Sequence, residues 1–371
     1  MAKCTFYDTP NIYTTRNFVS FAPVALLLQL DVKGSSYFIE KLSSMRQEVP
    51  IKNSSYIPDL LGDGFERLTL EFPPDYEGEV IATLIRSTTH KTSEKAVLYV
   101  HGFNDYFFQR EMALNFNDHG YNFYALDLRK YGRSYLKHQK FNNVRALSEY
   151  DEEIHQALQL IKLENNHQVL LMGHSAGGLI TTNYAANHLH STLFHGLIGN
   201  SPFYEFNLGY FTRTLIVPAV AFLGHYFPNI RISGIPSGSY GKSIHAESHG
   251  EWDYSLTWKP HEVPKINLGF ITAIYTAQKN IRRKQVIGIP TLILHGSTTV
   301  HEKNWSEKFQ EGDAVLNVDH IKKYANKLKG TITVVEIKKG LHDLILSKKP
   351  VREAVYKVLF DWINTNFNRT H

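Results

Sequence analysis

The stretch VLLMGHSAGGL (residues 169–179) constrains the fold of this chain more than any other part of its sequence. An apolar run, typical of a buried strand, is followed at once by Gly173, Ser175 and Gly177 in the pattern G-x-S-x-G. Because glycine has no Cβ, these flanks let a strand-to-helix turn tighten until the serine is strained and its hydroxyl is exposed. A strand interior gains nothing from this arrangement, so we predict that Ser175 is a nucleophile.

Short apolar runs alternate with helical segments over most of the chain. Two antiparallel strands are expected over 65–72 and 80–86, separated by the turn sequence PPDYEG. Further strands are expected over 96–100, 122–127, 169–172, 195–199, 290–296 and 331–337. Continuous apolar strands that alternate with helices predict βαβ units. The fold class is therefore α/β, with a mostly parallel central sheet and helices on both faces.

The composition changes along the chain and predicts three regions. Residues 1–64 are irregular and end in the turn sequence LGDG, which indicates an extension packed on the core. Residues 65–371 carry the alternating pattern of one large domain. Residues 202–285 interrupt that pattern and are rich in aromatic residues, proline and glycine. We expect this insertion to form a cap over the carboxyl end of the sheet.

One N-terminal segment, FVSFAPVALLLQLD (residues 18–31), is the candidate for a targeting or membrane signal. It is too short to span a bilayer and lacks a small-x-small cleavage site, so we expect it to lie on the core. The single cysteine, Cys4, allows no intrachain disulfide and fits a reducing compartment. The protein is therefore expected to be cytoplasmic and without stable membrane insertion.

The charge pattern argues against a nucleic-acid partner. The chain has 40 Lys and Arg against 35 Asp and Glu, a net charge of +5 that is spread along the sequence. The densest basic cluster, IRRKQ (residues 281–285), is short and typical of a solvated face. The stretch PSGSYGKS resembles the end of a phosphate-binding loop, but Pro236 replaces its first glycine and no apolar strand precedes it. We therefore expect no nucleotide site there.

A serine nucleophile needs a base, and the best-placed histidine is His342. It lies in KKGLHDL, a glycine-marked loop between the last strand and the last helix. In an α/β sheet with this turn the expected chain order is serine, acid, histidine. His101 and His174 precede any candidate acid, and we expect them to shape loops. His245 and His249 have the spacing of a metal pair, but no third ligand supports them, so no metal site is predicted.

The candidate acids follow the strand PTLIL, and they are Asp313 and Asp319, with Glu311 behind them. Only a carboxylate near the end of that strand can reach the far side of His342. Asp313 is nearer to it than Asp319, so we predict Asp313 as the acid and expect Asp319 to cap the following helix. The end of the preceding strand holds Asn200, which cannot act as a carboxylate.

An attacking serine also needs donors for the oxyanion that forms. The first is expected to be the backbone N–H of Ala176, the residue after the nucleophile. The second comes from the loop YVHGFNDYFF, after the first parallel strand, whose glycine lets the backbone turn toward the site. Phe103 is the best candidate for that N–H.

Five motifs together carry a family resemblance. They are VLYVHGFNDYFFQ, GYNFYALDLRKYGRS, VLLMGHSAGGL, LHGS and GLHDL. In this order they resemble the α/β-hydrolases, in the branch of monoacylglycerol-lipase-like and serine-aminopeptidase-like enzymes, over residues 65–367 apart from the cap. The resemblance implies an α/β-hydrolase fold with Ser175 as nucleophile, His342 as base, Asp313 as acid, backbone donors at Phe103 and Ala176, and no cofactor. The chain departs from the family pattern at Ala176, where methionine is usual, and in a longer segment before Asp313.

These features predict a serine hydrolase that cleaves carboxylic esters through an acyl-enzyme on Ser175. The apolar, aromatic cap sequence favours a small-molecule ester with an apolar acyl group. A serine peptidase with the same triad is the alternative, and a carboxylate for its substrate's free amine could come from Glu205, Glu247, Glu251 or Glu262. A ligand-binding protein without catalysis on the same scaffold is the third possibility, since one fold hosts many functions.

Overall fold

The computed structural model describes residues 55–233, 238–283, 285–302 and 304–367. The chain divides into two compact units, Met1–Asn53 and Ser54–His371, and the described residues all belong to the second. Most of the expected N-terminal extension, the apolar segment 18–31 and Cys4 therefore lie outside the described residues.

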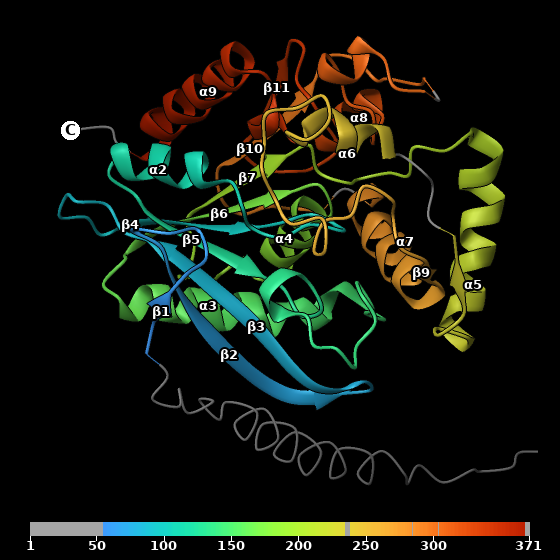
Figure 1. The fold of residues 1–371 in the computed structure, drawn as a ribbon, viewed down its shortest axis with the longest axis horizontal. Helices are drawn as coiled ribbons and strands as arrows, with labels where there is room; N and C mark the ends of the chain where they lie inside the picture. The colour runs from blue at the N-terminus through green and yellow to red at the C-terminus, as the bar shows by residue number, and fades with distance from the viewer. Residues whose placement is uncertain (1–54, 234–237, 284, 303, 368–371) are drawn as a thin grey trace, which may run out of the picture. The chain divides into compact units, whose positions relative to one another are not determined.

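The described unit alternates strands and helices (Figure 1). Its strands are β1 (Ile57–Pro58), β2 (Glu66–Asp75), β3 (Gly78–Ser87), β4 (Lys95–Val100), β5 (Asn122–Asp127), β6 (Gln168–His174), β7 (Gly196–Asn200), β8 (Arg231–Ile232), β9 (Ile266–Asn267), β10 (Thr291–Gly296) and β11 (Ile332–Ile337). Its α-helices are α2 (Arg110–Asp118), α3 (Asp151–Leu163), α4 (Ala176–Asn187), α5 (Val217–Tyr226), α6 (Gly238–Ile244), α7 (Leu268–Arg282), α8 (Val318–Ala325) and α9 (Lys349–Phe367).

Nine of these strands form one sheet in the order β1-β2-β3-β5-β4-β6-β7-β10-β11. The strands β5, β4, β6, β7, β10 and β11 are parallel to one another, and β1, β2 and β3 add an antiparallel edge. The predicted mostly parallel sheet is confirmed, as is the antiparallel pair that precedes it. The order also brings the carboxyl ends of β4, β6, β7 and β10 side by side, which is where open α/β sheets place their ligands.

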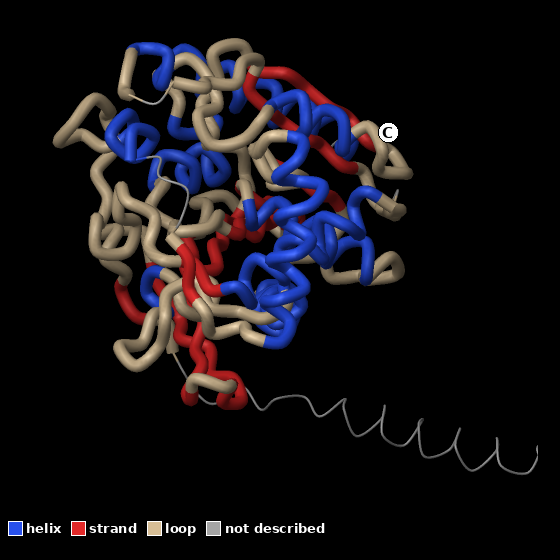
Figure 2. Tube along the Cα trace, turned by 90° about the vertical axis from the view of Figure 1, so that its right-hand side faces the viewer, coloured by secondary structure: helices blue, strands red, loops and turns tan. Residues whose placement is uncertain are grey.

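The central strands β4, β5, β6, β7 and β10 are buried on both faces, which explains why their sequences are almost continuously apolar. In β4, Leu98 belongs to a core cluster that includes residues of α3, α4, α7 and α8, whereas the next residue, Tyr99, belongs to a second cluster with α2 and α9. Successive side chains of a strand point to opposite faces, so a central strand needs apolar residues at nearly every position. Figure 1 shows α2 and α9 on one side of the sheet and α3 and α4 on the other, and Figure 2 shows the strands (red) between helices (blue).

The segment between β7 and β10 carries α5, α6 and α7. Helices α5 and α7 pack closely because Gly224 lies against the backbone of Leu268, where a Cβ would collide. The opposite side of α5 and its flanks expose large apolar side chains: Tyr210, Phe211, Leu215, Ile216, Phe222, Leu223, Tyr226, Phe227, Ile230 and Ile232. No helix in the described part of the chain is long and apolar enough to cross a membrane.

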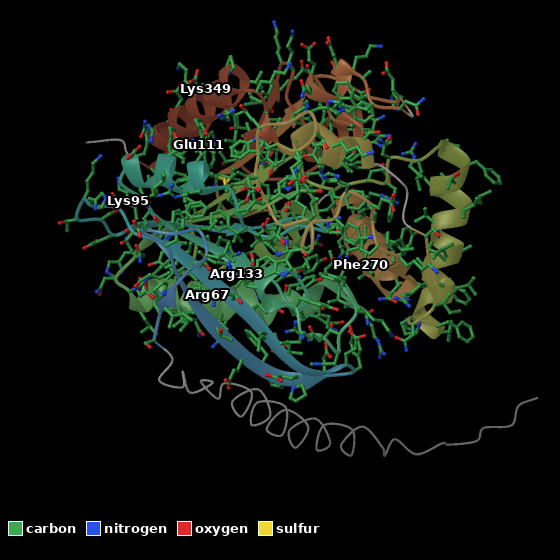
Figure 3. The ribbon with its side chains drawn as sticks, viewed as in Figure 1. Arg67, Lys95, Glu111, Arg133, Phe270 and Lys349 are labelled. Carbon is green, nitrogen blue, oxygen red and sulfur yellow. The ribbon has the colours of Figure 1, made fainter. Side chains whose placement is uncertain are left out.

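A buried ion-pair cluster fixes the start of the described unit to the sheet. Arg133, labelled in Figure 3, has a side chain that is 1% exposed. Its guanidinium donates to both carboxylate oxygens of Asp59 at 2.8 Å and to Asp127 Oδ2, at the end of β5, at 2.9 Å. Burial acts to raise the pKa of Asp59, but the hydrogen bonds and charge of Arg133 hold it below its usual value. One cation therefore bridges two carboxylates from different parts of the chain.

We expect Arg133→Met to lower the free energy of unfolding by about 3–5 kcal/mol, because it leaves two buried carboxylates without a counter-ion. The control is Lys357→Met, which breaks the exposed pair of Lys357 and Asp361 on α9 and should cost less than about 1 kcal/mol. Urea denaturation of both variants measures the difference. Equal losses would contradict a special role for the buried cluster.

Candidate active site

The site is built on the turn between β6 and α4. Ser175 follows the last residue of β6 and has φ 53° and ψ −116°, a conformation that L-residues rarely adopt. Backbone hydrogen bonds hold it there, because its N–H donates to Asn200 C=O at 3.0 Å and its C=O accepts from Leu179 N–H at 3.1 Å and Phe203 N–H at 2.9 Å. The strained turn predicted from G-x-S-x-G is thus present, with neighbours that hold it in place.

The glycines of the motif allow the strand, the helix and a neighbouring loop to come together. A Cβ on Gly177 would collide with the backbone of Val100 and His101 at the end of β4, and one on Gly173 would collide with the backbone of Gly177. Each glycine is therefore required by a close backbone approach. Together they bring the start of α4 against both β6 and the end of β4.

The structure brings the three predicted side chains together in a relay of hydrogen bonds. His342, in the loop between β11 and α9, has Nε2 at 2.9 Å from Ser175 Oγ and Nδ1 at 3.0 Å from Asp313 Oδ2. Ser175 is 7% exposed, His342 3% and Asp313 0%. Because Asp313 accepts, Nδ1 carries the imidazole hydrogen and Nε2 is free to accept from the serine hydroxyl.

The other oxygen of Asp313 is held by the backbone. Asp313 Oδ1 accepts from Val315 N–H at 2.8 Å and Leu316 N–H at 2.7 Å, which leaves Oδ2 for the imidazole. Asp313 itself is aligned by backbone hydrogen bonds to Thr298 and Val300 in the segment after β10. The carboxylate is therefore fixed before any substrate arrives.

The two other candidate acids lie away from this relay. Asp319 is exposed in the first turn of α8 and is not the cap that we expected. Asn317 caps this helix, because its side-chain oxygen accepts from the N–H groups of Asp319 and His320. The cap lies two residues earlier because only Asn317 has the extended backbone of an N-cap. Glu311 pairs with Lys339 on the surface.

The candidate oxyanion donors come from two segments that lie next to Ser175. Ala176 is the first residue of α4, and an N–H in the first helical turn has no intrahelical acceptor. The loop after β4 passes close by, since a Cβ on Gly102 would lie 3.1 Å from Ser175 Cβ. The next residue, Phe103, stacks on Phe270 of α7 with ring centroids 5.0 Å apart, which braces that loop (Figure 3 labels Phe270).

The remaining histidines have other surroundings. His101 accepts from Leu128 N–H at 3.1 Å through Nε2, and burial lowers its pKa, so it joins the loops after β4 and β5 as a neutral ring. The ring of His174 lies 4.9 Å from that of His342. His245 contacts the backbone of Tyr254. Among the residues within the described ranges, His, Cys, Asp and Glu side chains form no group of three or more that could hold a metal.

Two buried pairs beside the relay were not foreseen from the sequence. Asp343 accepts from Asn200 Nδ2 at 2.7 Å, and Asp105 accepts from Lys259 Nζ at 2.8 Å. Burial acts to raise the pKa of Asp105, but the charge of Lys259 holds it well below its usual range. The only signal for the first pair is that Asn200 ends a strand beside the nucleophile. The sequence around Lys259 does not predict its pairing with Asp105, because Lys259 lies in the insertion and Asp105 follows β4.

Comparisons with known proteins agree with this fold. The family model described as "Serine aminopeptidase, S33" matches residues 91–345. A monoacylglycerol lipase from Paleococcus ferrophilus superposes with a TM-score of 0.56 at 16% identity, covering 81% of this chain and 99% of that chain. A soluble variant of the monoglyceride lipase from Saccharomyces cerevisiae, in complex with a substrate analog, gives 0.56 at 16% identity, covering 86% and 96%.

A putative hydrolase from Agrobacterium vitis gives a TM-score of 0.54 at 15% identity, covering 81% of this chain and 99% of that chain. At these identities the likeness shows the fold. No curated protein sequence matches the chain. The match to the family model covers well over half of the residues, and with it the elbow and all three residues of the relay. The chain belongs to the serine aminopeptidase (S33) family of the α/β-hydrolases.

Proposed function

We propose that this protein is a serine hydrolase that cleaves carboxylic esters through an acyl-enzyme on Ser175. The observation that carries the proposal is the unbroken relay from Ser175 Oγ through His342 to Asp313, built on a strained elbow. Nucleophile, base and orienting acid within hydrogen-bond reach are the arrangement that activates a serine hydroxyl. Membership of a hydrolase family supports the same reaction type.

In the first half-reaction, Ser175 Oγ attacks the acyl carbon while His342 Nε2 takes the hydroxyl proton. The carbonyl π electrons move to its oxygen, and the N–H groups of Phe103 and Ala176 stabilise that oxyanion, aided by the N-terminus of α4. Asp313 keeps the imidazole tautomer and stabilises the imidazolium. The oxyanion then re-forms the carbonyl, the bond to the alkoxy group breaks, and His342 gives its proton to the leaving alcohol.

In the second half-reaction, water replaces the alcohol. His342 Nε2 takes a proton from water as its oxygen attacks the acyl carbon, and the same backbone donors stabilise the second oxyanion. Collapse breaks the bond to Ser175 Oγ, which recovers its proton from the imidazolium. The products are an alcohol and a carboxylic acid, and the enzyme is restored.

The surroundings of the relay support a substrate with an apolar acyl group. The insertion 202–285, which we propose as the cap, contributes Phe203, whose N–H holds Ser175 C=O, and Phe206, which packs edge-on against Phe203 at 5.2 Å. It also contributes Tyr240, whose ring lies edge-on to His342 at 5.8 Å. These aromatic side chains favour apolar over charged substrate groups.

The charges of the insertion disfavour the peptidase alternative. Recognition of a free amine needs a carboxylate that is not already neutralised. Glu205 is paired with Arg282 at 2.5 Å and accepts from Tyr324 at 3.1 Å, and Glu251 is paired with Arg352. Two of the four glutamates proposed for an amine are thus bound to arginines.

The first prediction is that Ser175→Ala abolishes labelling by a fluorophosphonate probe, because the variant lacks the attacking oxygen. The matched control is Ser243→Ala, which removes another buried serine hydroxyl, in α6. Both variants should unfold within a few degrees of the parent. Labelling is read on a gel, and a labelled Ser175→Ala protein would overturn the assignment, as would an unlabelled parent.

The second prediction separates the two aspartates. Asp313→Asn should lower kcat by about 10⁴-fold without loss of fold, because an amide favours the wrong imidazole tautomer. Asp319→Asn removes only a charge from the exposed first turn of α8 and should stay active, at a cost of about 0.3–1 kcal/mol in unfolding free energy. Ester hydrolysis and thermal unfolding measure the two effects. The reverse pattern would move the acid to Asp319.

The third prediction concerns chain length. For p-nitrophenyl esters from acetate to decanoate, kcat/KM should rise with each methylene, which is worth up to about 0.8 kcal/mol when buried. Phe206→Ala should flatten this profile, whereas Phe222→Ala, on the exposed side of α5, should leave it unchanged. A flat profile in the parent protein would argue against an apolar acyl pocket, and assays of aminoacyl anilides alongside test the peptidase alternative.

A further inference from the structure

Asn200 is hydrogen-bonded on two sides of the site. It is the last residue of β7, where its Cα pairs with His174 of β6 and Leu294 of β10, and it is 1% exposed. Its backbone C=O accepts the N–H of Ser175 at 3.0 Å. Its side chain faces the histidine loop, where Nδ2 donates to Asp343 Oδ1 at 2.7 Å and Oδ1 accepts Leu344 N–H at 3.3 Å.

These contacts bind the two residues that directly follow His342. The imidazole itself is held by Ser175 and Asp313, but its backbone is placed by the loop on which it lies. The side chain of Asn200 holds that loop, and the backbone C=O of the same residue holds Ser175. A central, buried strand moves less than a loop, so Asn200 couples the position of this loop to that of the Ser175 elbow.

We propose that Asn200 is a positioning residue, which locks the His342 loop to the Ser175 elbow through the carboxylate of Asp343. The proposal rests on the proposed function, since it assigns a role within the same relay. Asn200 touches no reacting atom and acts through the placement of His342.

The chemistry of Asp343 explains why the residue is an asparagine. Asp343 is 1% exposed, and its carboxylate accepts from Asn200 Nδ2, from Ile345 N–H at 3.2 Å and from Gln109 Nε2 at 3.1 Å. An amide supplies a donor to this carboxylate and an acceptor to Leu344 N–H. A carboxylate at position 200 would place two like charges in contact. Asn200, at the end of β7, cannot act as the acid of the relay, but its amide is suited to bind Asp343 and Leu344.

Gln109 provides a matched control. It is fully buried at the start of α2 and donates to the same carboxylate, through the other oxygen. Gln109→Met removes one donor to Asp343, as Asn200→Ala does, but leaves the link between elbow and histidine loop. A loss of donors alone would therefore affect both variants alike, and a loss of positioning would affect only Asn200.

The test measures kcat and KM with a p-nitrophenyl ester, together with the rate of fluorophosphonate labelling, for the full-length protein. Asn200→Ala and Asn200→Asp should lower kcat and the labelling rate by about 100-fold, the cost of a displacement near 1 Å, with KM changed less than about 3-fold. Gln109→Met should lose stability but keep kcat within about 3-fold.

A swap variant guards against simple misfolding. Asn200→Asp combined with Asp343→Asn restores one donor facing one carboxylate, so its kcat should recover at least about 10-fold over Asn200→Asp alone. Equal losses in the Asn200 and Gln109 variants, or no recovery in the swap, would overturn the inference. The labelling rate requires Ser175 and His342 but no particular ester. A parent protein that labels but cleaves no ester would therefore refute the ester proposal and leave this test valid.

Discussion

The close approach of three backbones around Ser175 is the constraint on which the rest of the site depends. The start of α4 lies against the ends of β4 and β6, and only glycine fits at positions 173 and 177. This crowding leaves Ser175 in a strained conformation of a kind that costs on the order of 1–3 kcal/mol. The contacts of the surrounding sheet must offset this cost. The packed apolar cores on both faces of the sheet keep this backbone rigid. Ser175 keeps this conformation because the backbone around it cannot relax.

A second consequence of the sheet is that it fixes residues that are far apart in sequence. Ser175, Asp313 and His342 follow β6, β10 and β11, and these strands run parallel in one sheet. The acid is oriented by two N–H groups of its own loop, so it does not depend on the histidine for its place. Because these three residues are buried, each hydrogen bond between them is stronger, and an unpaired polar group is more costly, than in water.

Local patterns predicted the parts of this structure that are themselves local. The strands were visible as apolar runs because both faces are covered, and the elbow was visible because its glycines are adjacent in sequence. Asp313 was favoured over Asp319 by its distance from β10, and the structure brings Asp313 to the imidazole. The cap at Asn317 was missed because two polar residues near the helix start compete for it. The pairing of Asn200 with Asp343 joins segments that only the tertiary fold brings together, so the place of Asn200 at a strand end does not by itself predict its partner.

The ion pair of Lys259 and Asp105 joins the insertion to the loop after β4. Asp105 lies two residues after Phe103, and its buried counter-ion comes from the insertion. Asn104 and Tyr106, on either side of it, are also hydrogen-bonded to the backbone of residues 255–260. The insertion is therefore not an exchangeable module. A chimera that took this region from a relative without an equivalent lysine would leave the buried carboxylate of Asp105 without its lysine counter-ion, in the loop that passes beside Ser175.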